Sequence, residues 1–298
     1  MRELTGIGEP AWAGLVDPAT GEGSDAVWKQ YWGLSVDPFY APGTPYVATS
    51  GHDEAIARLV GSIESTQRRT IVQAGEGLGK SLIVSLALRE TRHPSRRFAC
   101  VTAPVDGPEM LATLAHGLGA SVPPDASRSV AWRALVQGVR LCRLQNLHTV
   151  LVVEDAHFLN EDADCRDLDR LVHLDSGGGA RVTVIESFLD MRNLFRPFSP
   201  IEEGSRAELA VRLPPLTRSE TGRYLSTKLA WAGRTEAAFA PRAIGAVHEI
   251  AGGVPRVLDR LGSLALMAGA ARGREIVTPD ILADVASECR SHPYEPAA

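Results

Sequence analysis

The chain has 298 residues, of which 44% are hydrophobic and 22% charged, so it is an ordinary globular sequence long enough for one large domain or two modest ones. Its formal net charge of -5 gives no overall attraction to nucleic acid, although this does not exclude a local basic surface. The four cysteines lie far apart without a Cys-x-x-Cys pair, which argues against a disulfide framework and a zinc site and favours a reducing cytoplasm.

The N-terminal residues 1–27 are rich in glycine, proline, alanine and acidic residues without clear periodicity, and we expect a flexible extension there. This stretch lacks the basic and then apolar pattern of a secretory signal. No run in the chain reaches the ~18 apolar residues that a membrane span needs. We therefore expect a soluble protein. Residues 28–39 are unusually aromatic and are expected to pack against a core.

The most informative stretch is residues 70–81, a short apolar run that breaks into a glycine-dense turn ending in Lys-Ser. We expect a helix over 51–65, a strand over 70–73 and, after the turn, a second helix. A strand, a glycine-rich turn and a helix in that order predict a phosphate-binding loop, because backbone N–H groups and the helix N-terminus attract anions. The residues expected to hold nucleotide phosphates are Ala74, Gly75, Glu76, Gly77, Leu78, Gly79, Lys80 and Ser81.

Two side chains of this loop have specific chemistry. Lys80 can reach the β- and γ-phosphates of a nucleotide, and the Ser81 hydroxyl can ligate Mg²⁺. The pattern Gly-x-x-x-x-Gly-Lys-Ser/Thr has glycine where this chain has Ala74, and alanine fits there if its φ is negative. The alternative is a glycine-rich turn that precedes Lys-Ser by chance. The apolar strand and the helical run on the correct sides of the turn argue against that alternative.

Downstream of the loop, strand patterns alternate with helix patterns. The predicted strands cover residues 97–102, 149–153, 181–185 and 208–213, and the predicted helices cover residues 79–90, 108–118 and 129–144. This alternation predicts an α/β fold, a P-loop NTPase in which helices flank a parallel sheet. The strand 149–153 is apolar throughout, which is typical of a central strand covered on both faces.

The central strand ends in the sequence Glu-Asp-Ala-His, at Glu154 and Asp155. Ligands of parallel sheets bind beyond the carboxyl ends of the strands. We predict that Glu154 holds Mg²⁺ together with Ser81, and that Asp155 orients or deprotonates the attacking water. Lys80, Glu154 and Asp155 are therefore the candidate catalytic residues. The alternative is an acidic cap on the next helix. Around Ser187, after the following strand, a polar side chain could sense the γ-phosphate.

After a proline pair at residues 214–215 the chain becomes helical. The predicted helices cover residues 219–231, 241–250, 254–270 and 279–289. The expected organisation is a flexible extension over 1–27, an α/β nucleotide-binding domain over 28–215 and a helical lid domain over 216–298. Arg256 begins the third helix beside a Gly-Gly-Val-Pro turn, from where it could swing over a nucleotide held by the first domain.

With these pieces in place, about residues 28–288 resemble the AAA+ ATPases of the ExeA/GspA secretion type and their transposition relatives of the TniB/TnsC type. The shared motifs are Tyr-Trp-Gly-Leu and Pro-Phe at residues 31–39, the Gly-Glu-Gly-Leu-Gly-Lys-Ser loop, the Glu-Asp-Ala-His strand end, the Leu-Pro-Pro-Leu turn at 213–216 and Gly-Gly-Val-Pro-Arg. The resemblance implies ATP and Mg²⁺ binding by a RecA-like sheet with a helical lid, and a homo-oligomer in which a neighbour's arginine completes each site.

The resemblance also assigns roles to single residues. It makes Lys80 and Ser81 the Walker A pair, Glu154 and Asp155 the Walker B pair, and Arg256 the sensor arginine of the lid. The candidate arginine fingers are Arg206 and, behind it, Arg196. The family usually reads Asp-Glu-Ala-His, so the longer and the shorter acid are exchanged here. A displacement of ~1 Å in a catalytic group can lower a rate on the order of 100-fold, so slow hydrolysis is expected.

We expect a cytoplasmic ATPase that hydrolyses ATP with Mg²⁺ to drive or license assembly of an unidentified partner complex, of the secretion or envelope type. Two alternatives stay open. One is a nucleotide-dependent switch with little hydrolysis. The other is a transposition regulator that binds DNA through arginines. The competing interpretation of these arginines is that they form a solvated surface. The arginines considered are Arg68, Arg69, Arg96 and Arg97.

Overall fold

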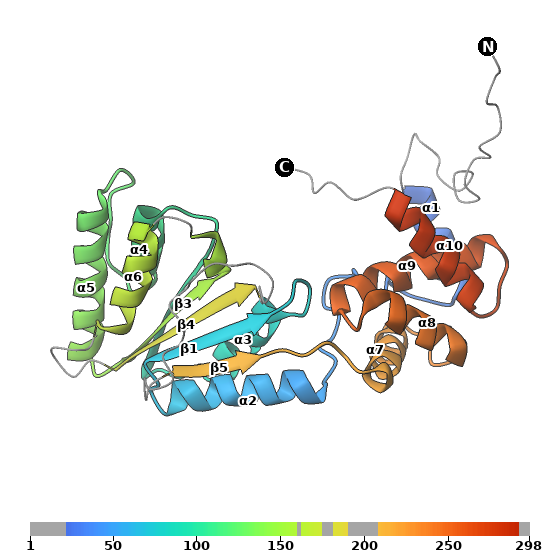
Figure 1. Cartoon of the computed structure of the whole chain (residues 1–298), viewed down its shortest axis with the longest axis horizontal. Helices are drawn as coiled ribbons and strands as arrows, with labels where there is room; N and C mark the ends of the chain where they lie inside the picture. Colours follow the sequence, from blue (N-terminus) through green and yellow to red (C-terminus); the bar gives the residue numbers. More distant parts are fainter. Residues whose placement is uncertain (1–21, 160–161, 175–180, 190–207, 292–298) are drawn as a thin grey trace, which may run out of the picture. The chain divides into compact units, whose positions relative to one another are not determined.

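The computed structural model describes residues 22–159, 162–174, 181–189 and 208–291, and the chain divides into two compact units. One unit is Ser50–Pro214, an α/β unit, and the other combines Met1–Thr49 with Pro215–Ala298 and is helical in its described residues. Figure 1 shows the elements of both units along the chain. Most of the expected N-terminal extension, residues 1–21, lies outside the described residues.

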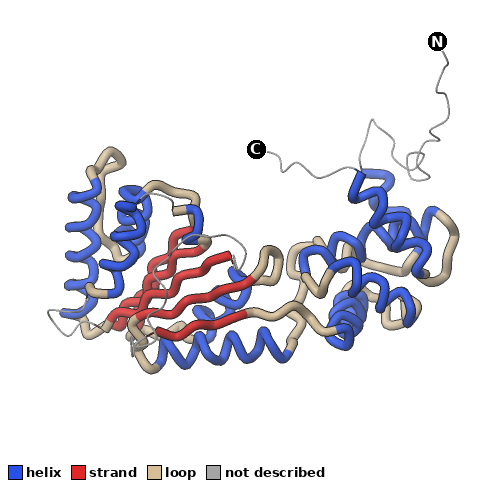
Figure 2. The backbone as a smooth tube through the Cα atoms, in the orientation of Figure 1, coloured by secondary structure: helices blue, strands red, loops and turns tan. Residues whose placement is uncertain are grey.

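The α/β unit is built on one sheet of five parallel strands, drawn in red in Figure 2. In spatial order the strands are β2 (Arg96–Thr102), β3 (His148–Glu154), β4 (Val182–Leu189), β1 (Arg69–Ala74) and β5 (Glu208–Arg212). The strand that leads into the phosphate loop is thus flanked by β4 and β5, and the strand that ends at Glu154 lies between β2 and β4. The predicted fold class, a parallel sheet flanked by helices, is confirmed.

Helices cover both faces of this sheet (Figure 1). On one face lie α2 (Ser50–Glu64) and α3 (Lys80–Glu90), and on the other lie α4 (Gly107–Gly117), α5 (Arg128–Leu144) and α6 (Asp162–Val172). Because β3 is covered on both faces, every residue of the strand from His148 to Val153 is buried, and only its last residue, Glu154, is partly exposed. The sheet therefore presents the Glu154 carboxylate at the edge where its strands end.

The predicted strands and helices of this unit agree with the structure within a few residues, and β4 continues to Leu189, beyond the predicted end of its strand. One helix was missed. Sequence reasoning gave no bounds for a helix between β3 and β4, whereas the structure has a short 3-10 helix at Ala156–Phe158 and then α6. Six of the eleven residues of α6 are charged, so few apolar residues remain there to indicate a helix.

The helical unit contains five helices in its described residues. They are α1 (Glu22–Tyr31), α7 (Arg218–Trp231), α8 (Pro241–Ala251), α9 (Pro255–Ala271) and α10 (Pro279–Ser291). Local signals explain the starts of α7, α8 and α9. Thr217 forms a capping box with Glu220 at α7, and a proline occupies the first turn of α8 and α9, where its missing N–H is not needed.

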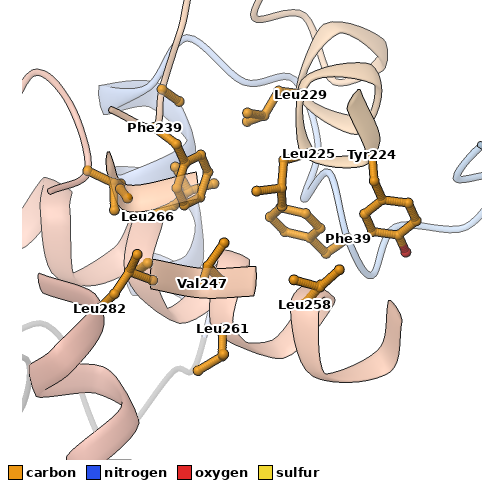
Figure 3. Packing of buried hydrophobic residues seen from close by; sticks show 14 of the residues in the cluster. Phe39, Tyr224, Leu225, Leu229, Phe239, Val247, Leu258, Leu261, Leu266 and Leu282 are labelled. Carbon is orange, nitrogen blue, oxygen red and sulfur yellow. The ribbon is translucent and has the colours of Figure 1, made fainter. Parts of the chain in front are cut away.

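The core of the helical unit includes aromatic residues from the segment before α2, as Figure 3 shows for Phe39 beside Leu225 and Leu258. Trp32 is 2% exposed and donates a hydrogen bond of 2.7 Å from its indole Nε1 to the carbonyl of Leu266 in α9. Residues 28–49 therefore group with the C-terminal helices, whereas the sequence reading assigned them to the nucleotide-binding domain. Helix α1 also begins inside the expected flexible extension.

Among the residues that the structure describes, no helix combines the length and the hydrophobicity that a membrane-spanning helix requires.

Candidate nucleotide site

The phosphate loop, residues 75–79, connects the end of β1 with the start of α3. Gly77 and Gly79 have φ angles of 74° and 94°, in the left-handed region that glycine adopts without strain. Gly79 is the N-cap of α3, and no side chain caps the helix there. The first turn of α3 therefore offers its backbone N–H groups and the positive end of the helix dipole to an anion. Ala74 ends β1 with a negative φ, which is the condition under which alanine fits this position.

Helix α2 supports this loop from the side. His52 in α2 is 5% exposed, and its Nε2 lies 2.8 Å from the carbonyl oxygen of Leu78. Because a carbonyl only accepts, Nε2 carries the proton of this hydrogen bond. The same ring nitrogen lies 3.4 Å from where a Cβ at Gly79 would be, so the imidazole packs directly on the end of the loop. No local sequence signal identified His52 as a support of this loop.

The structure brings Lys80 and Asp155 together at the carboxyl edge of the sheet. The Nζ atom of Lys80 lies 3.9 Å from Oδ1 of Asp155, and the two side chains are 9% and 29% exposed. Lys80 opens α3, and Asp155 follows the end of β3. An ammonium and a carboxylate from distant parts of the chain thus meet beside the uncapped N-terminus of α3. This arrangement suits a phosphate group, which would bind the ammonium and the backbone N–H groups together.

Glu154 projects toward the helix that begins with the phosphate loop. Leu151 and Val153 belong to the core on the α4 to α6 face of the sheet, so by alternation Glu154 points to the opposite face, where α2 and α3 lie. Burial raises the pKa of Cys100 on the neighbouring strand β2, and the negative charge of Glu154 raises it further. Ser81 is exposed in the first turn of α3. A carboxylate and a hydroxyl are oxygen ligands of the kind that Mg²⁺ prefers.

Asp155 has an uncommon backbone conformation, with φ 52° and ψ 38° in the left-handed region. Its backbone N–H donates a hydrogen bond of 2.9 Å to Oγ of Ser187, a fully buried residue of β4. Two residues further on, His157 accepts a hydrogen bond of 3.3 Å at Nδ1 from the backbone N–H of Leu189. Two hydrogen bonds therefore join the turn that follows β3 to the end of β4.

The ring of His157 also contacts Phe158, with ring centroids 4.2 Å apart. Burial lowers the pKa of His157; the negative charge of Asp155 opposes this effect and the positive charge of Lys80 adds to it. The imidazole is therefore neutral at pH 7, as an Nδ1 atom that accepts a hydrogen bond must be. Sequence reasoning assigned no role to His157, although its position two residues after the acids was visible in the sequence.

Three predicted site residues lie outside the described part of the α/β unit. Arg256 is exposed in the first turn of α9, in the helical unit, so its role as a sensor arginine stays a prediction. The candidate arginine fingers Arg206 and Arg196 lie outside the described residues.

The arginines considered for DNA binding differ in their surroundings. Arg69 is 18% exposed and forms an ion pair of 2.9 Å with Glu186, whose side chain is fully buried. Arg96 donates a hydrogen bond of 2.8 Å to the carbonyl of Thr91. Arg97 is exposed at the start of the edge strand β2. Arg69 therefore has a structural contact in the sheet and does not belong to a freely solvated surface.

No protein-family model matches the chain. The chain is 22% identical over 259 residues to General secretion pathway protein A of Aeromonas hydrophila, in an alignment that covers 86% of this chain and 47% of that protein. The chain thus spans about half the length of this curated relative.

Solved structures show the same fold at low sequence identity. Cdc6p from Pyrobaculum aerophilum superposes with a TM-score of 0.67 at 18% identity, over 86% of this chain and 71% of that one. The ORC1 protein of Aeropyrum pernix, solved in complex with DNA, superposes with a TM-score of 0.62 at 18% identity, over 83% of this chain and 67% of that one. The chain therefore has the P-loop fold of the AAA+ ATPases and resembles the GspA type in sequence, as its motifs indicated.

Proposed function

We propose that this chain binds ATP with Mg²⁺ at the edge formed by the phosphate loop and the end of β3, and that it hydrolyses the bound ATP. The observation that carries the proposal is the approach of Lys80 Nζ to Asp155 Oδ1, 3.9 Å apart beside a helix N-terminus that no side chain caps. An anion binds readily where an ammonium and unpaired helix N–H groups converge, and an acid beside it is available to a water molecule.

Each residue of the site has one expected task. Lys80 and the backbone of the phosphate loop hold the β- and γ-phosphates, and Ser81 and Glu154 supply oxygen ligands for the metal ion. When bound, Mg²⁺ supplies positive charge that stabilises the phosphate oxygens. Asp155 accepts a proton from, or orients, the water that attacks the γ-phosphate. When Lys80 binds the phosphate, its contact of 3.9 Å with Asp155 is expected to weaken. The Asp155 carboxylate is then available to the attacking water.

The order of the two acids favours slow turnover. Glu154 is one methylene longer than the aspartate usual at the metal position, and Asp155 is one methylene shorter than the glutamate usual at the second position. Each carboxylate is displaced by about 1 Å, which is enough to lower a rate on the order of 100-fold. This supports, as a second candidate, a nucleotide-dependent switch that holds ATP and rarely hydrolyses it.

The relatives suggest a setting for this activity. The similarity to General secretion pathway protein A supports a role in driving or licensing assembly of a partner complex at the envelope. The ORC1 structure contains DNA, which keeps a DNA-binding regulator among the candidates. In either setting we expect a homo-oligomer in which Arg256 and a neighbour's arginine complete the site. A cytoplasmic location stays a prediction from the cysteine content and the N-terminal sequence.

Phosphate release from ATP tests the proposal. The wild-type chain with Mg²⁺ should release phosphate, Lys80→Ala should reduce the rate at least tenfold by loss of binding, and Asp155→Asn should bind ATP normally but hydrolyse it poorly. Lys29→Ala removes a lysine of the helical unit and serves as the matched control, with an unchanged rate expected. Equal rates for wild type and Lys80→Ala would remove the claim of an ATPase. Tight ATP binding with negligible release by wild type would favour the switch.

A further inference from the structure

The backbone at Asp155 is held in a conformation that most residues avoid. Within the described residues only Thr66, Asn146 and Asp155 have a positive φ without being glycine. Aspartate is among the side chains that adopt this region, but it still loses roughly 1 kcal/mol relative to right-handed conformations. Thr66 and Asn146 follow the ends of α2 and α5. Asp155 is the member of this group that lies at the nucleotide site.

Ser187 is placed to hold that conformation. β3 and β4 are parallel neighbours with Val153 opposite Glu186, so the next residue of β4, Ser187, lies beside the turn that leaves β3. Ser187 is 0% exposed, and its Oγ accepts the backbone N–H of Asp155 at 2.9 Å. A buried N–H without an acceptor destabilises the conformation that buries it, so this hydroxyl favours the left-handed turn over conformations that redirect the N–H.

We propose that Ser187 is a positioning residue that fixes Asp155 in its left-handed conformation, and thereby directs the Asp155 carboxylate toward Lys80 and the reacting water. The catalytic consequence rests on the function proposed above. Ser187 acts on the reaction through the Asp155 backbone, and its hydroxyl does not contact the γ-phosphate. This differs from the sensing role that the sequence position alone suggested.

The contact between His157 and Leu189 gives independent support to the proposal. It links the same turn to the same strand two residues further along both segments, at 3.3 Å between Nδ1 and the Leu189 nitrogen. Ala156 between the two contacts is fully buried in the core beneath α4 to α6. With both ends of the turn bonded to β4 and its centre buried, Asp155 can leave the left-handed region only by breaking one of these two bonds or by exposing Ala156.

Amide hydrogen exchange in the nucleotide-free chain tests the contact itself. In wild type the Asp155 amide should be protected, and in Ser187→Ala it should exchange about tenfold faster or more, because the acceptor is gone. Ser187→Cys keeps the volume with a weaker acceptor and should fall between the two. Ser62→Ala, which removes another buried serine hydroxyl of the α/β unit, should leave the Asp155 amide unchanged. Unchanged protection in both Ser187 variants would overturn the proposal.

A double-mutant cycle on hydrolysis separates positioning from direct contact. Ser187→Ala should lower kcat about tenfold and leave KM for ATP within about twofold, and it should add no further loss in an Asp155→Asn background. An equal loss in both backgrounds would show that Ser187 acts independently of Asp155 and would overturn the proposal. If no variant hydrolyses ATP, the proposed function fails by itself while the exchange experiment still decides the role of Ser187.

Discussion

The imidazole of His52 donates a hydrogen bond of 2.8 Å from Nε2 to the carbonyl of Leu78, and so joins α2 to the phosphate loop. The loop has two residues in the left-handed region, and its shape depends on such contacts from outside. The site is therefore built by α2 as well as by the strand and the helix that flank the loop.

His52→Ala should weaken ATP binding about fivefold to tenfold, because a buried hydrogen bond is worth about 1 kcal/mol and its loss lets the loop relax. Titration with a fluorescent ATP analogue measures the change in Kd. His116→Ala is the matched control, since His116 braces another loop of the same unit through Val122, and its Kd should equal that of wild type. A normal Kd for His52→Ala would show that the loop keeps its shape without α2.

Arg69→Gln should destabilise the α/β unit by about 3 kcal/mol, because it removes the guanidinium that neutralises the fully buried Glu186. Urea denaturation followed by circular dichroism measures the free energy of unfolding. Arg97→Gln alters an exposed arginine on β2 and should change this free energy by less than about 0.5 kcal/mol. Similar small effects for both variants would mean that Arg69 behaves as a surface residue, and would restore it as a candidate for DNA contact.

The stability of the α/β unit should depend on His148 in mildly acidic solution. Burial, with smaller contributions from Arg96 and Arg181, lowers the pKa of His148 from 6.5 to about 4. The unfolded chain then binds more protons than the folded one between these values. The contribution of His148 to stability is complete above pH 6.5 and falls by about 1.4 kcal/mol per pH unit as the pH decreases toward 4.

His148→Gln should therefore lose less stability than wild type when urea denaturation is repeated at pH 7 and about pH 5. Glutamine can keep a hydrogen bond to Thr183, the present partner of the imidazole at 2.9 Å. His93→Gln changes an exposed histidine and should follow the wild-type pH dependence. If His148→Gln and wild type lose equal stability between these two pH values, His148 is not the group responsible.

Gly262→Ala should destabilise the helical unit by about 1 kcal/mol or more, although alanine favours helices, because overpacking a core outweighs the gain in propensity. A Cβ at Gly262 would lie 2.5 Å from Cζ of the buried Phe39 ring. Gly222→Ala in α7 is the matched control, because its Cβ would meet Ile244 at 3.4 Å, and its stability should stay level or rise. Thermal unfolding compares the two variants, and a higher melting temperature for Gly262→Ala would contradict the packing described here.

Local sequence signals predicted the parts of the fold in which each residue acts with its near neighbours. The strand predicted over 149–153 and the Gly-Leu-Gly-Lys-Ser turn are specified by their own residues, and both agree with the structure within a residue or two. Helix α6 was missed because ion pairs, as well as apolar packing, hold it in place. Arg128 at the start of α5 bonds Asp164 and Asp167 at 2.7 and 2.8 Å, and no local pattern identifies such a partner.

The remaining differences depend on contacts between distant residues. Trp32 bonds Leu266, which lies 234 residues away, so the segment around it groups with the C-terminal helices although it precedes the α/β unit in the chain. Ser187 bonds Asp155 only because β3 and β4 are neighbours in one particular register. Sequence reasoning found the polar position at Ser187, which it placed after the strand, but could not assign its partner, since register is a property of the assembled sheet.

Calorimetric titration of the purified chain with ATP in the presence of Mg²⁺ tests the central claim most directly, because it requires no partner and no turnover. The account predicts saturable heat for wild type and for Lys29→Ala, and none for Lys80→Ala, whose ammonium is the group placed to meet the phosphates. An absence of binding heat for wild type, or an undiminished signal for Lys80→Ala, would contradict the account.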